Sequence, residues 1–120
     1  MLFFVKRLRQ RLIWSWRGVH RTWQSEHSFR SWVWANLVSG MLAISLPISV
    51  AERALILSLG VLVLAFELLN TAIEDTVDYI SNEEHPLAER AKDAGSAGVF
   101  VASLAAGLAW VVVLAQFLPG

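Results

Sequence analysis

The chain of 120 residues contains no cysteine, so no disulfide can stabilise the fold and no thiolate can act in catalysis. It also lacks the glycine-rich phosphate loops of soluble nucleotide-binding enzymes and any spacing typical of zinc ligands. Charge is scarce in three stretches: residues 33–50 and 97–118 have none, and residues 54–73 have only Glu67. The uncharged stretches are therefore the main evidence for the fold.

These three stretches are long enough to cross a membrane. A hydrocarbon core about 30 Å thick requires about 20 apolar residues. The apolar fraction of 56% exceeds the roughly 45–50% of soluble domains. Too little polar sequence remains to cover three such runs in a soluble helical protein. We therefore predict one all-α integral membrane domain over residues 1–120, with three transmembrane helices at about 33–50, 54–73 and 97–118.

The basic residues are concentrated near the N-terminus, where seven of the ten Lys and Arg residues precede residue 31. Between Phe3 and Trp23 they alternate with leucine and tryptophan, a pattern typical of an amphipathic helix lying in the membrane surface. We predict this surface helix over about residues 3–30, with Gly18 as a point of interruption. Anionic headgroups explain the arginines, at about 1 kcal/mol each, so no nucleic-acid partner is expected.

The same basic residues predict the orientation, because cytoplasmic segments of membrane proteins are enriched in Lys and Arg. We expect a cytoplasmic N-terminus, an external connection at residues 51–53, a cytoplasmic connection at residues 74–93 and an extracytoplasmic C-terminus. The apolar run Leu2–Val5 is too short for a cleaved secretory signal, and arginines follow it instead of preceding it. We therefore expect the whole chain to be mature protein.

The connection between the second and third apolar runs carries helix signals. The second helix is expected to continue past its apolar run to Tyr79, and residues 81–82 (Ser-Asn) to end it. His85 precedes Pro86, and proline is favoured in the first turn of a helix. The third transmembrane helix is therefore predicted to begin near Pro86.

Glu67 lies near the end of an apolar run, where a carboxylate costs a few kcal/mol and marks a candidate functional residue. A hydrated glutamate without a role is the alternative. Polar residues recur at spacings of three and four from this position: Glu67, Asn70, Thr71, Glu74 and Asp78. They form one helical stripe that must face protein or water. Repelling carboxylates favour a divalent cation such as Mg²⁺, and a carboxylate without metal contact could serve as a general base.

A second group of polar residues leads into the third apolar run. Lys92 and Ser96 stand there beside Gly95 and Gly98. Small residues favour close packing between membrane helices, and this is the favoured explanation of the glycines. Lys92 could meet a phosphate as a point charge.

Two sequence motifs follow one another between residues 67 and 97. Residues 67–74 read Glu-Leu-Leu-Asn-Thr-Ala-Ile-Glu and precede Val77-Asp78, and residues 85–88 read His-Pro-Leu-Ala and precede Ala-Lys-Asp-Ala-Gly-Ser-Ala at residues 91–97. Together they resemble the signature of the prokaryotic diacylglycerol kinase family, and the resemblance covers nearly the whole chain. It implies a homotrimer in the bacterial inner membrane, with active sites shared between subunits, that phosphorylates a lipid hydroxyl with ATP and Mg²⁺.

The resemblance also implies roles for individual residues. Glu67 looks like the general base that takes the proton from the lipid alcohol, and Asn70 like a residue that helps to hold the site. Glu26 and Glu74 look like the metal-binding carboxylates. The positions assigned to ATP are Arg7, Trp14, Glu26, Glu74, Glu83, Glu84, His85, Lys92 and Asp93. The positions assigned to the lipid are Glu67, Ser28, Phe29, Arg30, Arg53 and Ser96. Trp14 departs from the family pattern, which has a tyrosine there.

The lipid acceptor stays open between two branches of the family. After Phe29-Arg30 the best-known diacylglycerol kinases carry Gln-Glu, whereas this chain has Ser31-Trp32. The His-Pro-Leu-Ala stretch is similar to the undecaprenol kinase branch, and residues 15–18 and 95–97 are similar to the diacylglycerol kinase branch. We favour phosphorylation of diacylglycerol to phosphatidic acid, with undecaprenol, giving undecaprenyl phosphate, as the alternative.

Two non-enzymatic functions also remain. A small channel could place Glu67 in its pore, but it does not account for Asn70, Glu74 and Lys92 together. A membrane adaptor could use the basic helix to bind lipid, and it would show no dependence on Mg²⁺.

Overall fold

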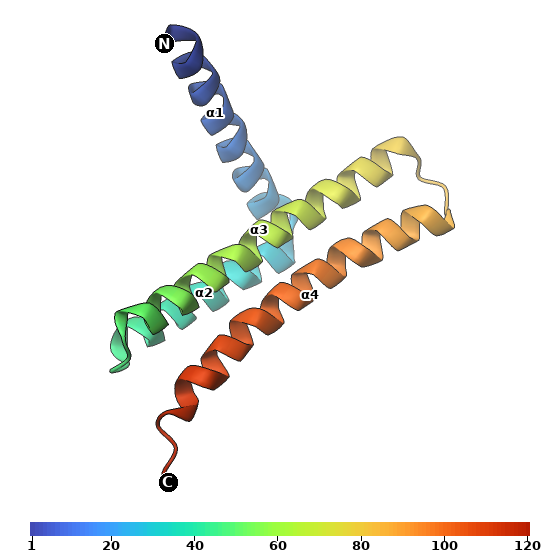
Figure 1. Ribbon diagram of the computed structural model, residues 1–120. Coiled ribbons are helices and arrows are strands. Elements are labelled where there is room, and N and C mark those ends of the chain that lie inside the picture. The colour runs from blue at the N-terminus through green and yellow to red at the C-terminus, as the bar shows by residue number, and fades with distance from the viewer.

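The computed structural model describes all 120 residues as four α-helices without a strand, which confirms the all-α prediction. The helices are α1 (Leu2–Ser25), α2 (His27–Ser45), α3 (Val50–Ile80) and α4 (Pro86–Ala115). Helices α3 and α4 form a long antiparallel hairpin, α2 lies along the first part of α3, and α1 projects away from the other three (Figure 1). The molecule is consequently elongated, with extents of 57 × 46 × 23 Å.

Local signals explain where the two long helices begin. Ser49 accepts a hydrogen bond from the backbone N–H of Glu52 at 3.1 Å, and the Glu52 carboxylate accepts one from the Ser49 N–H at 3.0 Å. This reciprocal capping box satisfies two amide groups that the helix leaves unpaired. At α4, the His85 ring accepts from the Leu87 N–H at 3.0 Å, and Pro86 occupies the first turn. The predicted end of one helix at Ser81 and start of the next near Pro86 are both confirmed.

The N-terminal helix is shorter than predicted. We expected it to reach residue 30, but α1 ends at Ser25, and Glu26 adopts extended backbone angles (φ −113°, ψ 109°) before α2 begins at His27. The expected interruption at Gly18 is wrong, because α1 runs through this residue. A glycine inside an exposed helix costs about 1 kcal/mol without breaking it.

The first apolar run is not one continuous helix. We expected a helix over 33–50, but α2 ends at Ser45, and Leu46 is extended (φ −80°, ψ 148°) ahead of Pro47. Proline removes a backbone donor and disfavours helical angles in the residue before it. Residues 51–53, expected in a connection, form the first turn of α3 instead. Helix α4 likewise ends at Ala115, short of residue 118.

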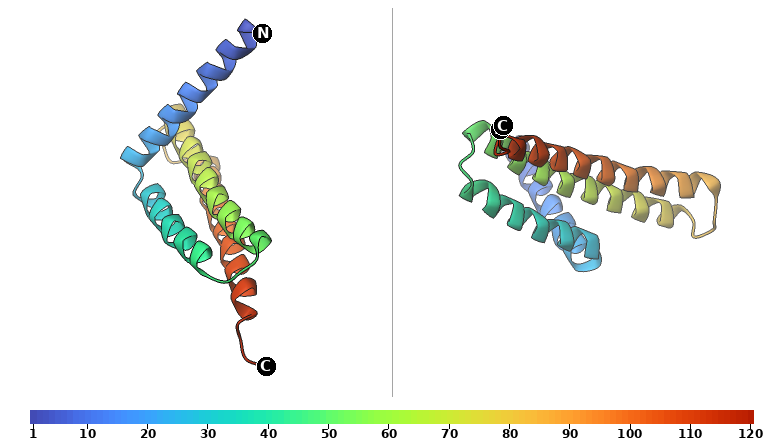
Figure 2. Two further views of the ribbon diagram at one scale, coloured as in Figure 1. Left: turned by 90° about the vertical axis from the view of Figure 1, so that its left-hand side faces the viewer. Right: turned by 90° about the horizontal axis from the view of Figure 1, so that it is seen from below.

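Helices α3 and α4 are each long and apolar enough to cross a membrane, and α2 does not reach that standard. Only 22% of the most apolar stretch of α3 and 17% of that of α4 are buried. Large side chains such as Leu104, Leu108 and Val111 are therefore exposed. Core helices of soluble proteins bury such side chains. Figure 2 shows α3 and α4 side by side, with α2 at one side of the pair.

Small residues allow the hairpin to pack closely. A side-chain carbon at Gly98 would lie 3.4 Å from the Phe66 ring, and one at Gly95 would lie 2.5 Å from Asn70 Oδ1. The prediction that these glycines serve helix packing is confirmed. A compact apolar cluster that includes Ala43, Ile56 and Ala109 joins α2, α3 and α4 at the other end of the bundle.

Candidate active site

The polar stripe of α3 faces a cavity of about 400 Å³ between α2, α3 and α4. Its lining residues are Ser28 and Trp32 of α2, Glu67, Asn70 and Glu74 of α3, and Ser96, Val99, Phe100 and Ser103 of α4. The sequence prediction that this stripe faces protein or a water-filled site agrees with the arrangement. The cavity gathers residues from three helices that are far apart in the sequence.

Glu67 is the most buried acid of the site, with only 5% of its surface exposed. Ser28 donates a hydrogen bond to Glu67 Oε2 at 3.2 Å, and Oε1 has no hydrogen-bond donor within the chain. A buried carboxylate is costly unless it is paired or hydrogen-bonded. With one oxygen held and the other free, this carboxylate is oriented and still able to accept a proton.

Asn70 lies one helical turn beyond Glu67 and links α3 to α4. Its Nδ2 donates to Glu74 Oε1 at 3.0 Å, which fixes one oxygen of that carboxylate. Its Oδ1 is buried against Gly95 and has no hydrogen-bond partner. Buried acceptors without a partner are uncommon and are often found at functional sites. Asn70 therefore positions Glu74 and adds an unused acceptor to the site.

Glu26 lies at the break between α1 and α2, near the acids of α3. Partial burial raises the pKa of its carboxyl, and the charges of Glu74, Asp75 and Glu67 raise it further, while Arg30 opposes them. A carboxyl whose pKa is raised by neighbouring acids lies in a field of negative charge that a cation would neutralise. The oxygen donors of Glu26 and Glu74 therefore suit Mg²⁺. Within one chain, no three His, Asp or Glu side chains gather closely enough to hold a metal ion.

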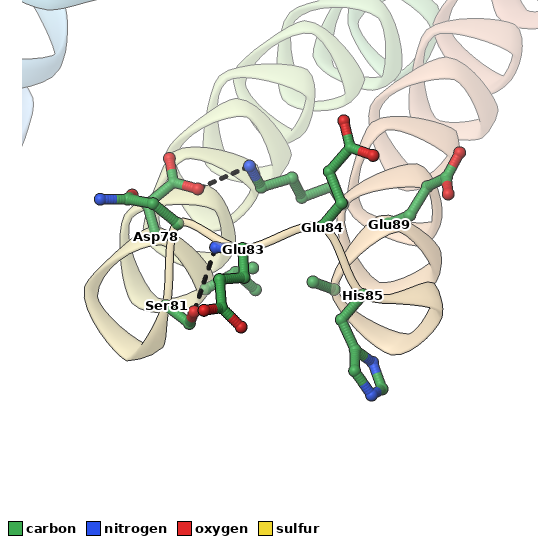
Figure 3. A pocket seen from close by; sticks show the side chains of 10 residues that line it. Asp78, Ser81, Glu83, Glu84, His85 and Glu89 are labelled. Carbon is green, nitrogen blue, oxygen red and sulfur yellow. Dashed lines mark hydrogen bonds and ion pairs between the residues drawn. The ribbon is translucent and has the colours of Figure 1, made fainter.

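A second cavity, of about 320 Å³, lies where α3 and α4 are joined by residues 81–85 (Figure 3). Its lining includes Asp78, Glu83, Glu84, His85 and Lys92, of which all but Asp78 were assigned to ATP by the resemblance. Lys92 Nζ contacts Asp78 Oδ1 at 2.6 Å, and both side chains are about half exposed. Figure 3 shows Glu84 and Glu89 extending to one side of the loop and His85 to the other.

The structure does not bring every predicted residue to these cavities. Arg7 and Trp14 lie on the part of α1 that projects from the bundle, and Trp14 is 58% exposed. Arg53 is fourteen residues before Glu67 on α3, roughly 21 Å along the axis. Asp93 is exposed and lines neither cavity.

Phe29 and Arg30 are engaged in the junction between α1 and α2. Phe29 is 3% exposed, so little of its surface can meet a ligand. The Arg30 guanidinium donates to the carbonyls of Trp23 and Gln24, the latter at 3.2 Å. A cation at the C-terminal end of α1 also suits the helix dipole.

Sequence reasoning missed several residues of the site. Asp78 had been placed in the stripe, but its pairing with Lys92 was not foreseen, although helices joined by a short loop bring such positions together. Asp75 contributes to the field at Glu26 and lies one position from Glu74. Trp32 and Ser103 line the Glu67 cavity. Trp32 was noted as a departure from the family pattern and not as a site residue, and no sequence signal distinguished Ser103 from other residues of its apolar run.

Comparison with known proteins places these features in one family. Residues 13–114 match the prokaryotic diacylglycerol kinase family. A diacylglycerol kinase of Pseudomonas aeruginosa is 41% identical over 110 residues, which cover 92% of this chain and 89% of that protein. A diacylglycerol kinase of Escherichia coli K12 is 40% identical over 100 residues, covering 83% of this chain and 82% of that protein.

A relative named for a different activity matches almost as well. An undecaprenol kinase of Bacillus subtilis is 37% identical over 106 residues, which cover 86% of this chain and 81% of that protein. Both kinds of relative are kinases, so the enzymatic nature of the chain does not depend on which acceptor is considered. The extent of these matches shows that the chain belongs to the prokaryotic diacylglycerol kinase family of membrane enzymes.

Proposed function

We propose that this kinase transfers the γ-phosphoryl group of ATP to diacylglycerol, giving phosphatidic acid at the cytoplasmic face of the inner membrane. The observation that carries the proposal is Glu67, a buried carboxylate near the end of the apolar part of α3. It lines a cavity that has both polar and apolar side chains in its walls. The hydroxyl of a bilayer lipid lies at this depth, near the boundary between acyl chains and headgroups. Glu67 is therefore the proposed general base.

The chain's own residues account for the proton transfer. Ser28 holds Glu67 Oε2, so the free Oε1 takes the proton as the lipid oxygen forms its bond to phosphorus and the bond to ADP breaks. The apolar neighbours Val99 and Phe100 limit the water that could replace the lipid as acceptor. Ser96, on the opposite wall, is the proposed contact for the lipid headgroup.

Glu26 and Glu74 are the residues that would hold Mg²⁺. Two carboxylates in one chain are enough for this ion, because Mg²⁺ commonly binds one or two carboxylates together with water and substrate phosphates. When bound, the ion supplies positive charge that offsets the charge of the phosphoryl oxygens. Asn70 keeps Glu74 in position through its 3.0 Å hydrogen bond.

Nucleotide binding is assigned to the cavity at residues 81–85 and to Lys92. Arg7 and Trp14 are separated from it within one chain because α1 projects away. A homotrimer, in which α1 of one subunit meets the site of another, would bring them together. We propose this assembly, with α2 as a third and shorter crossing, the N-terminus in the cytoplasm and the C-terminus outside.

The decisive experiment measures transfer of labelled phosphate from ATP by the purified protein in mixed micelles, with and without Mg²⁺. Diacylglycerol and undecaprenol are offered in separate tubes, and Glu67→Gln is the matched variant. We expect Mg²⁺-dependent labelling of phosphatidic acid by the wild-type protein and little by the variant. Absence of transfer to either lipid from folded, trimeric protein would overturn the proposal.

Undecaprenol is the second candidate acceptor, favoured by the relative of that name in Bacillus subtilis. Labelled undecaprenyl phosphate, without labelled phosphatidic acid, would establish this activity instead. The same base, metal carboxylates and nucleotide cavity would serve both reactions, since both acceptors present a primary hydroxyl at the membrane interface.

A further inference from the structure

A smaller cavity lies on the same three helices as the Glu67 cavity, farther from residues 81–85. Its volume is about 130 Å³, and its walls include Ala35, Ser39, Gly60, Val63, Ala106 and Trp110. Trp32 borders both this cavity and the Glu67 cavity. The two cavities are therefore neighbours along one seam between α2, α3 and α4.

The lining residues of the two cavities lie along one face of each helix. On α3 the walls are formed by Glu67, Val63, Gly60 and Ile56, at spacings of four, three and four. Lining positions follow the same helical period on the other two helices, at 28, 32, 36 and 39 on α2 and at 99, 103, 106 and 110 on α4. Each helix thus presents a single face to one groove.

The groove is about as deep as one membrane leaflet. Glu67 and Ile56 are eleven residues apart on α3, which corresponds to roughly 16 Å at the rise of an α-helix. The hydrocarbon core of a bilayer is about 30 Å thick, so one leaflet accounts for about half of that distance. A chain that starts with its headgroup at Glu67 would therefore end near the middle of the membrane.

A hydrogen bond closes the deep end of the groove. Trp110 Nε1 of α4 donates to Ser39 Oγ of α2 at 2.8 Å, and this bond joins two helices whose backbones do not approach each other closely. Asn36 Nδ2 donates a hydrogen bond to the Trp32 carbonyl at 2.9 Å. With these donors satisfied within the protein, the deep cavity does not require water to satisfy them.

We propose that this groove holds one acyl chain of the lipid acceptor and that the Trp110–Ser39 bridge limits the length of chain it takes. The proposal rests on the proposed function only in placing the acceptor hydroxyl at Glu67. Continuity with the Glu67 cavity favours an acyl chain over an unrelated ligand. Six of the nine residues that line the deep cavity are hydrophobic, and Asn36 Nδ2 and Ser39 Oγ are hydrogen-bonded within the protein. Apolar cavities of about 150 Å³ take a benzene-sized guest, so the deep cavity suits the end of a hydrocarbon chain.

The bridge also favours an acyl chain over undecaprenol. A polyprenol is much longer than one leaflet and is branched along its length, so it would have to pass the point where Trp110 and Ser39 meet. A groove that ends there fits a diacylglycerol chain of ordinary length. The groove therefore contributes a physical reason to favour diacylglycerol as the acceptor.

The first test is independent of catalysis. A diacylglycerol with a photoreactive diazirine near the end of one chain is irradiated with the wild-type protein in mixed micelles, and the labelled residues are identified by mass spectrometry. We expect labelling of the groove near Ala35 and Ala106 that unlabelled diacylglycerol suppresses. Labelling confined to outward residues such as Leu104 and Leu108, or labelling that is not suppressed, would overturn the proposal. Occupation of the groove by a second copy of the chain would give that same result.

The second test uses variants that shorten or open the groove. Ala106→Leu fills the deep cavity and should lower kcat/KM for dioleoylglycerol roughly tenfold relative to dioctanoylglycerol, the scale of one or two lost methylene contacts. Ser39→Ala and Trp110→Phe remove the bridge and should shift that ratio in the opposite direction. Ala115→Leu adds the same bulk at the exposed end of α4 and should leave the ratio unchanged. Equal ratios in all variants would overturn the proposal.

The two failures are distinguishable. If the wild-type protein transfers phosphate to diacylglycerol and the ratio does not respond to Ala106→Leu, the groove inference is wrong and the proposed function stands. If the wild-type protein transfers nothing, the proposed function is wrong, and suppressible photolabelling still decides whether the groove binds an acyl chain.

Discussion

The two ends of α3 differ in how completely their polar side chains are hydrogen-bonded within the chain. Near Val50, Ser49 and Glu52 satisfy each other through the capping box, and Gln116, directly after α4, donates to Glu52 Oε2 at 2.6 Å. Arg53 donates to three carbonyls around the end of α2, those of Ala43, Leu46 and Ile48, at 2.8, 3.2 and 3.3 Å. Polar groups at this end are matched to partners within the chain.

Toward the other end of α3, from Glu67 onward, some polar groups lack hydrogen-bond partners within the chain. Glu67 is buried with a single donor, Asn70 Oδ1 is buried with none, and the pKa of Glu26 is raised by burial and by the acids around it. An arrangement like this is unfavourable for the protein alone, and such groups are concentrated at functional sites. One end of the hairpin is therefore built for stability, and the other is left open for ligands.

The most direct test of this difference removes one carboxylate charge at each end of α3. Glu67→Gln should lower phosphate transfer by roughly 10²–10⁴-fold, the usual contribution of a general base. Glu52→Gln should leave turnover per folded molecule nearly unchanged and lower stability. Transfer assays and unfolding by increasing mole fraction of SDS measure the two effects. Equal loss of turnover in both variants would show that the ends do not differ in the way described.

Arg53 tests whether the Val50 end has a ligand role after all. Because its hydrogen bonds satisfy carbonyls at the end of α2, Arg53→Ala should lower the free energy of unfolding by roughly 2–3 kcal/mol. The free energy of unfolding of Arg53→Lys should lie between that of Arg53→Ala and that of the wild-type protein. A rise in KM for the lipid without loss of stability would instead support the lipid contact that the family resemblance implies.

The capping box should give a smaller effect. Ser49→Ala removes the N-cap acceptor of α3 and should lower stability by about 1 kcal/mol, without changing the Mg²⁺ dependence of transfer. Ser45→Ala is a matched control, because the Ser45 hydroxyl bonds only to the Met41 carbonyl within its own helix. A comparable loss in both variants would mean that the cap is not the stabilising contact.

The smallest predicted effect is a pH dependence at the open end. A carboxyl whose pKa is raised keeps its proton to higher pH, so the ion-free folded protein loses stability as pH rises through that pKa. Protons should also compete with Mg²⁺ at Glu26 at a higher pH than for an ordinary glutamate. The Mg²⁺ concentration for half-maximal transfer should therefore rise more steeply on acidification in the wild-type protein than in Glu26→Gln. Parallel curves would contradict this.

Much of the fold was predictable because its signals are local. The end of α3 at Ser81 and the start of α4 at Pro86 depend on a few adjacent residues, and both were correct. The errors also have local causes. The first apolar run was read as unbroken by weighing its composition above Pro47, and the surface helix was extended through Glu26, where no proline or glycine announces the break.

The site was predictable only in part for the same reason. The spacing of Glu67, Asn70 and Glu74 places them on one face of one helix, whatever packs against it. The positions of Arg7 and Trp14 relative to the cavity at residues 81–85 depend on how α1 leaves the bundle and, in the proposed trimer, on the neighbouring subunits. No local pattern contains that information.

The sequence by itself determined the helical class, the apolar character of α3 and α4, and the polar stripe that ends in the acidic connection. These follow from periodicity, from the scarcity of charge and from capping residues, all of which act within one or two helical turns. The tertiary structure alone decided that Ser28 holds Glu67, that Asn70 meets Gly95, and that Trp110 reaches Ser39. Such contacts join residues up to 71 positions apart. They depend on how each helix is rotated and how closely it packs, which the pattern along a single helix does not specify.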